Sequence, residues 1–419
     1  MALAWLNRDG RRLLVCRTLR TFGYGYLAVV LGLYLQQLGL SALQVGIVLT
    51  AAVAGSALMN VLWSLAADRF GRRRTVATMA VLMIAGGLVF AFADQLWLLV
   101  LGAFTGTISA SSAEVGPFVT VEQAILPQTA PDERRTWLFS IYDTVGNLAG
   151  AAGALFTGVV ALFARLGLSG ASSYRPLFVI YAVIGLLNLM LFLNLSGGVE
   201  SAHVEGARRF VGLHRSRGIV ARLSALFALD AFGGGFVLQS VVAYWFHVRW
   251  GLSPATLGLV FFWVGVLSGL SLLAAGWMAE RFGLLNTMVF THLPSNMLLI
   301  LVPLAPSAWL AVLLFLARMS VSQMDVPTRK SYTMAVVDPD ERTAAAGITN
   351  VARTAAGAVA PVISGAAVGF GAIGLPFFAA GALKIVYDAL IYSVFRNVHP
   401  PEERRPLTST RRSKPPRVR

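Results

Sequence analysis

Residues 64–74 read SLAADRFGRRR and residues 276–283 read GWMAERFG, so one short pattern occurs twice in this chain. In each copy an acidic residue, Asp68 or Glu280, is followed by arginine, phenylalanine and glycine. The two copies lie about 210 residues apart in a chain of 419 residues, a spacing that indicates two related halves.

Three further pairs of segments recur in the same order at nearly the same spacing. They are Phe22-Gly23 with Phe232-Gly233, LGLS at 38–41 with WGLS at 250–253, and PDER at 131–134 with PDER at 339–342. Such agreement is hard to obtain by chance, and it predicts that both halves share one fold.

The composition excludes most classes of protein. Hydrophobic residues make up 57% of the chain and charged residues 13%, whereas a soluble domain has about 25% charged residues. Disordered and collagen-like chains are excluded by the same apolar content. The single cysteine excludes a disulfide scaffold or a multi-cysteine metal site. What remains is an all-α polytopic membrane protein.

A helix needs about 20 mainly apolar residues to cross a bilayer, and by that measure the chain has twelve candidate spans. They lie at 14–36, 43–66, 76–93, 97–126, 136–164, 174–196, 219–248, 254–279, 286–305, 307–333, 343–368 and 372–395. The sequence therefore divides into four predicted regions. They are an N-terminal six-helix bundle at 1–196, a cytoplasmic linker at 197–218, a C-terminal six-helix bundle at 219–395 and a basic, disordered cytoplasmic tail at 396–419.

The net charge of +15 would suit a nucleic-acid binder, but in so apolar a chain it indicates basic cytoplasmic loops. Lysine and arginine gather on the side that holds the termini and the linker. The other side keeps Arg165, Arg175 and Arg249. We therefore expect a multi-pass protein of the plasma (inner) membrane with both termini in the cytoplasm. Its basic loops and tail would contact anionic lipid headgroups, and it would have no nucleic-acid partner. The first apolar run has full span length and no small-residue cleavage site, so it is expected to be retained as a span.

The repeated motif resembles the signature of the major facilitator superfamily, Gly-x-x-x-Asp-Arg-x-Gly-Arg-Arg. Residues 64–73 follow that signature except that Ser64 replaces its first glycine, and the second copy has leucines at 284 and 285 in place of the basic pair. The resemblance implies twelve helices in two parallel six-helix repeats, with transport by alternating access. It also implies that the motif is a cytoplasmic latch, although its arginines could instead serve only to fix the topology. The latch residues would be Asp68, Arg69, Gly71, Arg72, Glu280, Arg281 and Gly283.

Ionisable residues inside predicted spans are costly to bury, so each is a candidate functional residue. Counting 1.5 Å per residue places one group near the middle of the membrane. That group is Glu114, Asp230, Arg318 and Arg353. Asp325 aligns with Glu114 across the repeat, and the family resemblance implies that its helix also lines the central cavity, so Asp325 is a further candidate. We expect the arginines to hold an anionic group and the carboxyl groups to exchange protons. Asp230 aligns with Arg20 and precedes three glycines, 233–235, which suggest an unwound point in the span.

A second group of charges falls nearer the cytoplasmic surface. Arg20, Glu122 and Asp143 are expected to form a cytoplasmic gate, with Arg20 paired to one of the two acids, and Arg329 lies at similar depth. A purely structural Arg20–Asp143 pair is the alternative. Lys384 and Asp388 are four residues apart on a peripheral span, which predicts a local structural ion pair.

No enzyme signature is present in the sequence. It has no phosphate-binding glycine loop, no Gly-x-Ser-x-Gly motif and no zinc-spaced His/Cys cluster, so we expect no cofactor, no metal and no catalytic residue. His292, on another peripheral span, has no second metal ligand within reach by sequence.

The predicted function is secondary active transport of a small polar or charged solute by a monomer, with H⁺ as the expected coupling ion. A proton-coupled multidrug efflux antiporter is the first alternative. Ala151 weakens it, because the corresponding antiporter motif has proline there. A membrane sensor or scaffold that does not transport is the second alternative, suggested by the basic tail.

Overall fold

The computed structural model describes residues 5–112, 116–131, 134–200, 213–338 and 341–398, without the side chains at 64–66, 68–69, 135–137 and 343. Within these ranges every regular element is a helix. The predicted linker at 197–218 and tail at 396–419 fall largely outside the described residues.

The first half contains eight described α-helices. They are α1 (Arg8–Gln37), α2 (Ala42–Phe70), α3 (Arg72–Phe92), α4 (Leu96–Phe104), α5 (Pro117–Ile125), α6 (Arg135–Phe156), α7 (Val159–Arg165) and α8 (Arg175–Leu193). The second half also contains eight. They are α9 (Arg217–Gly235), α10 (Gln239–Trp250), α11 (Pro254–Phe282), α12 (Leu284–Leu301), α13 (Ala308–Ser322), α14 (Asp325–Val336), α15 (Arg342–Gly369) and α16 (Leu375–Phe395). Short 3₁₀ turns lie at Leu126–Thr129, Gly170–Ser173, Gly197–Val199 and Val302–Leu304.

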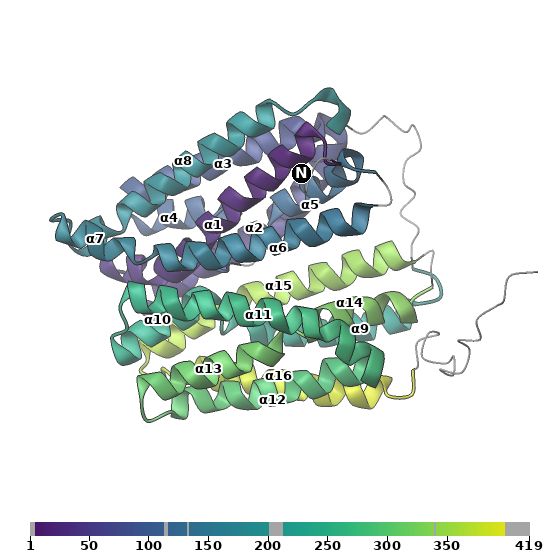
Figure 1. The fold of residues 1–419 in the computed structure, drawn as a ribbon. Coiled ribbons are helices and arrows are strands. Elements are labelled where there is room, and N and C mark those ends of the chain that lie inside the picture. The colour runs from purple at the N-terminus through teal and green to yellow at the C-terminus, as the bar shows by residue number, and fades with distance from the viewer. Residues whose placement is uncertain (1–4, 113–115, 132–133, 201–212, 339–340, 399–419) are drawn as a thin grey trace, which may run out of the picture.

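These helices make twelve crossings in two bundles of six, as the sequence predicts. Ten helical segments are long and apolar enough to span a membrane. The other two crossings are α1, whose first turns are rich in arginine, and the α4–α5 pair, which is broken in the middle. In Figure 1 helices α1–α8 lie together on one side of the molecule and α9–α16 on the other.

Three crossings are interrupted near their middle, where continuous spans were expected at 97–126, 219–248 and 307–333. The fourth breaks between α4 and α5 at Gly106, whose φ of +72° is readily adopted only by glycine. The seventh breaks after Gly235, as the glycine run at 233–235 suggests. The tenth breaks at 323–324, where Pro327 has no N–H to continue the α-helical ladder. Irregular backbone at this depth is tolerated where it lines a cavity.

The two halves meet tightly at the face opposite the termini. We call the side where α1 begins and α16 ends the termini face, and the other side the opposite face. Near the opposite face the Thr157 hydroxyl donates to the Pro254 carbonyl oxygen at 2.8 Å. The Val362 N–H donates to the Thr50 hydroxyl at 3.0 Å. Glycines on α2 and α15 bring those two backbones into direct contact at the same level. The structure is therefore closed at the opposite face.

A glutamate carboxylate caps a helix at each end of the segment that joins the two halves. The Glu200 carboxylate accepts hydrogen bonds from the N–H groups of Arg72 and Arg73, at 2.7 and 3.2 Å, at the start of α3. The Glu341 carboxylate accepts from the N–H groups of residues 214–216 just before α9, including that of Ser216 at 2.8 Å. Each acid thus occupies the electropositive N-terminus of a helix in its own half.

We predict that Gly365→Ala opens the opposite face. A methyl group at Gly365 would overlap the backbone oxygen of Ala42, and neither backbone can move without separating α2 from α15. Gly369→Ala is the matched control, because its nearest neighbour would be the Ala42 methyl at 3.9 Å. Electron–electron distance measurements between spin labels on α2 and α15 should lengthen for Gly365→Ala alone. Unchanged distances in both variants would show that the seal does not depend on this contact.

We also predict a pH-dependent contribution of Glu341 to stability. The N–H of His214, with smaller contributions from Ser216 and Arg215, lowers the pKa of Glu341 from 4.5 to about 2, against the opposing effect of desolvation. A carboxyl whose folded pKa is depressed stabilises the fold above its ordinary pKa, and the contribution is lost as pH falls towards the folded value. The melting temperature of Glu341→Gln should fall below that of the wild type at neutral pH, and the gap should shrink between pH 4.5 and 2. The exposed Glu280→Gln should show no such convergence, and a gap that is constant with pH would contradict the assignment.

Candidate solute and proton site

A cavity of about 450 Å³ lies between the two halves, on the termini side of the seal. More than half of its lining residues belong to the interrupted fourth and seventh crossings, and α2 and α15 supply most of the others. The second half contributes Asp230, Gly234, Gly235, Gln323, Asn350, Arg353 and Lys384, and the first half contributes Tyr24, Ser56, Thr107, Ser109 and Ser111. The cavity therefore has one charged wall and one wall rich in hydroxyl groups.

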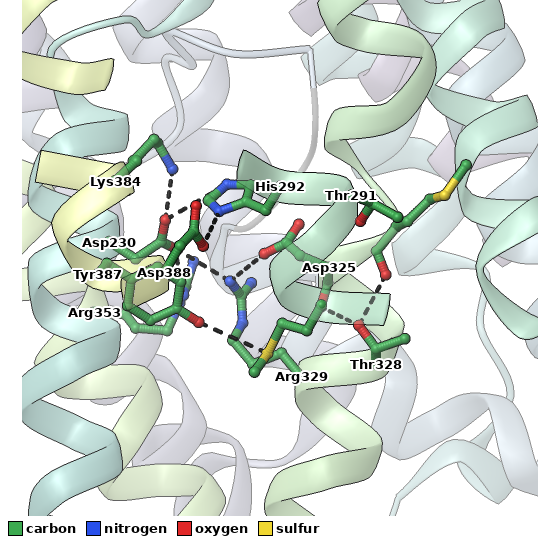
Figure 2. A network of polar contacts seen from close by, with 12 residues as sticks. Asp230, Thr291, His292, Asp325, Thr328, Arg329, Arg353, Lys384, Tyr387 and Asp388 are labelled. Atoms are coloured by element: carbon green, nitrogen blue, oxygen red, sulfur yellow. Dashed lines mark hydrogen bonds and ion pairs between the residues drawn. The ribbon is translucent and has the colours of Figure 1, made fainter. Parts of the chain in front are cut away.

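Asp230 is the centre of the charged wall, and its carboxylate contacts three cations from three other helices (Figure 2). Lys384 Nζ on α16 donates to Oδ1 at 2.6 Å. Arg329 on α14 and Arg353 on α15 each donate to Oδ2 at 3.1 Å. Asp230 is only 2% exposed, so its charge would be prohibitively costly without these partners.

Two further carboxylates complete the network behind Asp230. Asp325, on the first turn of α14, accepts a hydrogen bond from Arg329 at 2.7 Å. Asp388 on α16 lies 2.8 Å from Nδ1 of His292 on α12, and its second oxygen accepts from Asn296 at 2.9 Å. His292 Nε2 faces Asp230 Oδ1 at 3.9 Å, so the imidazole stands between two buried acids.

Arg318, expected to hold an anionic group, is buried on α13 beside the network. Its NH1 group contacts the sulfur of Met319 at 3.1 Å, and its Nε has no hydrogen-bond partner among the described residues. Arg318 is not one of the residues that line the cavity. Of the two arginines predicted to bind an anion, Arg353 is the one that lines it.

Two sequence-based interpretations of the second half are wrong. Lys384 does not pair with Asp388: its ammonium group binds Asp230, and Asp388 binds His292. Helix α16 therefore contributes to the network instead of being peripheral. Arg329 does not belong to a shallow layer, because its long side chain reaches Asp230 and Asp325. Depth counted along the backbone does not reveal where the end of a long side chain lies.

The first half has a matching but self-contained pair. Arg20 on α1 forms a bidentate ion pair with Glu122 on α5, at 2.7 and 2.8 Å, and both side chains are completely buried. The Tyr142 hydroxyl donates to Glu122 at 2.5 Å, and the Arg20 guanidinium stacks over the Phe118 ring. In the repeat Arg20 corresponds to Asp230, so the two halves place opposite charges at equivalent positions.

The remaining predicted site residues are dispersed. Asp143 is largely exposed and lies 3.9 Å from Arg17, whose guanidinium stacks over the Tyr142 ring. Glu114 and the side chains of Asp68 and Arg69 lie outside the described residues. At the repeated motif, Gly71 and Gly283 have φ of +90° and +84° between consecutive helices. Arg72 donates to the Ala124 carbonyl at 3.0 Å, and Arg281 lies over Trp277 on its own helix, where Glu280 is exposed.

The sequence matches the family model described as Major Facilitator Superfamily, over residues 13–249 and 223–418. An uncharacterized membrane protein of Saccharomyces cerevisiae is 26% identical over 425 residues, covering 94% of this chain and 95% of its own. Among solved structures, the nucleoside transporter NupG superposes with a TM-score of 0.70 at 13% identity, covering 93% of this chain and 100% of its own. A D-xylose–proton symporter superposes with a TM-score of 0.71 at 18% identity, covering 91% and 97%. At these identities the two structures show the shared fold alone.

We predict that the Arg20–Glu122 pair contributes far more to stability than an exposed arginine–carboxylate pair does. Removing one partner of a buried pair leaves an uncompensated charge, at a cost of about 3–5 kcal/mol. Arg20→Met and Glu122→Gln should each destabilise the protein strongly, and the double variant should lose less than the two losses combined. Chemical denaturation of all four proteins in mixed micelles measures this coupling energy.

The control for that cycle is Arg175–Asp94, a 2.6 Å pair whose side chains are 35% and 60% exposed. Breaking an exposed pair costs about 1 kcal/mol or less. Equal effects of Arg20→Met and Arg175→Met would show that the buried pair has no special role in the fold.

Proposed function

The chain belongs to the Major Facilitator Superfamily and is a membrane transporter rather than an enzyme, and we propose that it carries a small polar solute with an anionic group by proton-coupled alternating access. The observation that carries this proposal is the charged wall of the cavity. Among the described residues that line it, Arg353 and Lys384 provide two positive charges and Asp230 one negative charge. From these described residues an anion would therefore meet an excess of positive charge.

Arg353 is the residue most available to such an anion. Its side chain is 27% exposed, whereas Lys384 and Arg329 are each 9% exposed, and it holds Asp230 through a single 3.1 Å contact. A guanidinium has five N–H donors, so Arg353 can keep that contact and still bind a carboxylate or phosphate. Asp230 would then hold the cationic groups in position between transport cycles.

The wall from the first half would recognise the rest of the solute. Tyr24, Ser56, Ser109 and Ser111 line it with hydroxyl groups, which suit a hydroxylated or otherwise polar molecule. The cavity of about 450 Å³ accommodates a small metabolite. A bulky lipophilic cation would meet Arg353 and Lys384 at close range, which weighs against multidrug export.

The seal at the opposite face supports a state that is open towards the termini face. We propose that this face is cytoplasmic and that the basic residues around it contact anionic lipid headgroups. The motif at 68–73 and the acid Asp143 would act as latch and gate when the termini face closes. Lys330 on α14 is within electrostatic range of Asp143 on α6, so this pair would join the two halves on that side.

The test is a thermal-shift screen of the purified protein against small carboxylates, phosphates, amines and neutral sugars, followed by uptake into proteoliposomes. A bound solute stabilises the folded state by mass action, so members of the anionic classes should raise the melting temperature. Transport of amines or lipophilic cations instead, or stabilisation by neutral sugars alone, would contradict the proposal.

We predict that Arg353→Gln weakens binding of the anion by about 10- to 150-fold, because hydrogen bonds to charged groups contribute about 1.5–3 kcal/mol. Isothermal titration with the stabilising anion measures the change. Arg249→Gln is the matched control, since Arg249 stacks over Trp250 at the opposite end of the molecule. Equal affinity of Arg353→Gln and wild type would remove Arg353 from the site.

A further inference from the structure

His292 is the histidine of the charged network. It is 3% exposed and lies on α12, outside the set of residues that line the cavity. Its ring bridges two acids that belong to different helices, with Nδ1 at 2.8 Å from Asp388 Oδ1 and Nε2 at 3.9 Å from Asp230 Oδ1 (Figure 2). A buried imidazole between two carboxylates is a natural place for a proton, because both acids can stabilise the imidazolium that forms.

The hydrogen-bonded network around His292 is balanced in charge when the imidazole is neutral, and Arg318 is a further buried cation beside that network. The helices packed against α12 present Lys384, Tyr387 and Asp388 from α16, Asp325 and Arg329 from α14, and Arg318 from α13. Helix α11 has no ionisable residue before Glu280, and Asp230 brings in α9 together with Arg353 from α15. Within the hydrogen-bonded network three cations, Arg329, Arg353 and Lys384, face three carboxylates, Asp230, Asp325 and Asp388.

A single oxygen atom connects His292 with the cavity. Oδ1 of Asp230 accepts the hydrogen bond of Lys384 at 2.6 Å, and it is also the oxygen that faces His292 Nε2 at 3.9 Å. Lys384 lines the cavity and His292 does not. While Lys384 holds Oδ1, the negative charge available to the imidazole is reduced. A solute anion that draws Lys384 into the cavity would release Oδ1 to an imidazolium.

We propose that His292 is the proton-binding residue of this transporter. An anion that binds Arg353 and also draws in Lys384 would promote proton binding at His292, so that anion and proton move in the same direction. The proposal rests on the anionic solute proposed above. The lone pair of Nε2 accepts H⁺ from the cavity, by way of Asp230, to give an imidazolium that Asp388 and Asp230 both stabilise. Lys384 then neutralises the solute, so one monovalent anion and one proton enter the site without a change in net charge. Because coupling between sites is reciprocal, a bound proton strengthens anion binding equally.

The first test needs no solute. The chain has five histidines, so the protein labelled with ¹⁵N-histidine gives a simple spectrum in which His292→Gln identifies the His292 signals. When spectra are recorded from about pH 5 to 8, the wild-type signals should shift reversibly as the imidazole binds a proton. In Asp388→Asn, which keeps the shape of the side chain but removes the charge, the midpoint should fall by about one pH unit or more. A His292 signal that does not move between pH 5 and 8, or an unchanged midpoint in Asp388→Asn, would overturn the proposal.

The second test imitates the effect of the anion. Lys384→Met frees Oδ1 of Asp230, so the His292 midpoint should rise. Arg353→Met is the matched control, since it removes an equal charge from the other oxygen, Oδ2. A larger rise of the His292 midpoint in Lys384→Met than in Arg353→Met would support coupling through the shared oxygen, Oδ1 of Asp230. Equal rises would show a general electrostatic effect and overturn the coupling through Oδ1. His247, which binds the Leu252 carbonyl at the far end of α10, should keep its titration in every variant.

The third test separates this proposal from the proposed function. In proteoliposomes with a pH gradient, His292→Gln should lose proton-driven anion uptake but keep anion exchange, and His247→Gln should keep both. Gradient-driven uptake that survives in His292→Gln would overturn the proton role while leaving anion transport intact. If no carboxylate or phosphate is transported by the wild type, the proposed function fails, and the coupled direction of transport fails with it. The two titrations would then still decide whether His292 binds a proton.

Discussion

A carboxylate held in the interior of a membrane protein must be balanced by positive charge, and the second half of this molecule is organised around that constraint. Asp230 is bound by groups from α14, α15 and α16, so one side chain fixes four helices around a single point. The same contacts place a guanidinium and an ammonium group at the cavity wall. The cations that neutralise Asp230 are therefore also the cations that line the cavity.

The two halves satisfy this constraint in different ways. In the first half Arg20 is fully neutralised by Glu122, with Tyr142 and Phe118 around it, and no part of the pair reaches the cavity. In the second half Asp230 has more cationic partners than one carboxylate needs, and some of them remain available to a ligand. Equivalent positions of the two halves thus carry opposite charges: Arg20 belongs to a closed ion pair, whereas Asp230 belongs to a network that reaches the cavity.

The sequence predicted the architecture well because its signals are strong and local. Span length, each copy of the repeated motif and the glycine run at 233–235 can all be recognised from a short stretch of neighbouring residues. The site was predicted only in part. Asp230 and Arg353 could be singled out because a charge in a span is conspicuous, and both line the cavity. The spacing of Lys384 and Asp388, in contrast, suggested that they pair with each other.

The spacing was misleading because two residues four apart on one helix can each contact a different neighbouring helix. The packing of α16 against its neighbours, and not the spacing, decides which partners Lys384 and Asp388 have. Lys384 contacts α9, and Asp388 contacts α12. His292 likewise carried no signal as a single histidine in an apolar span. Its importance arises from two acids that lie 62 residues before it and 96 residues after it, and no local pattern brings these together.

The caps made by Glu200 and Glu341 have a consequence for the modular character of the chain. Each half completes its own hydrogen bonding at the boundary: Glu200 closes the start of α3, and residues 214–216 are held by Glu341. The join between the halves is thus bracketed by two contacts that do not depend on each other. A reporter domain inserted between the two caps would leave the capping hydrogen bonds of both bundles intact. This boundary is therefore the natural place to divide, relink or label the transporter.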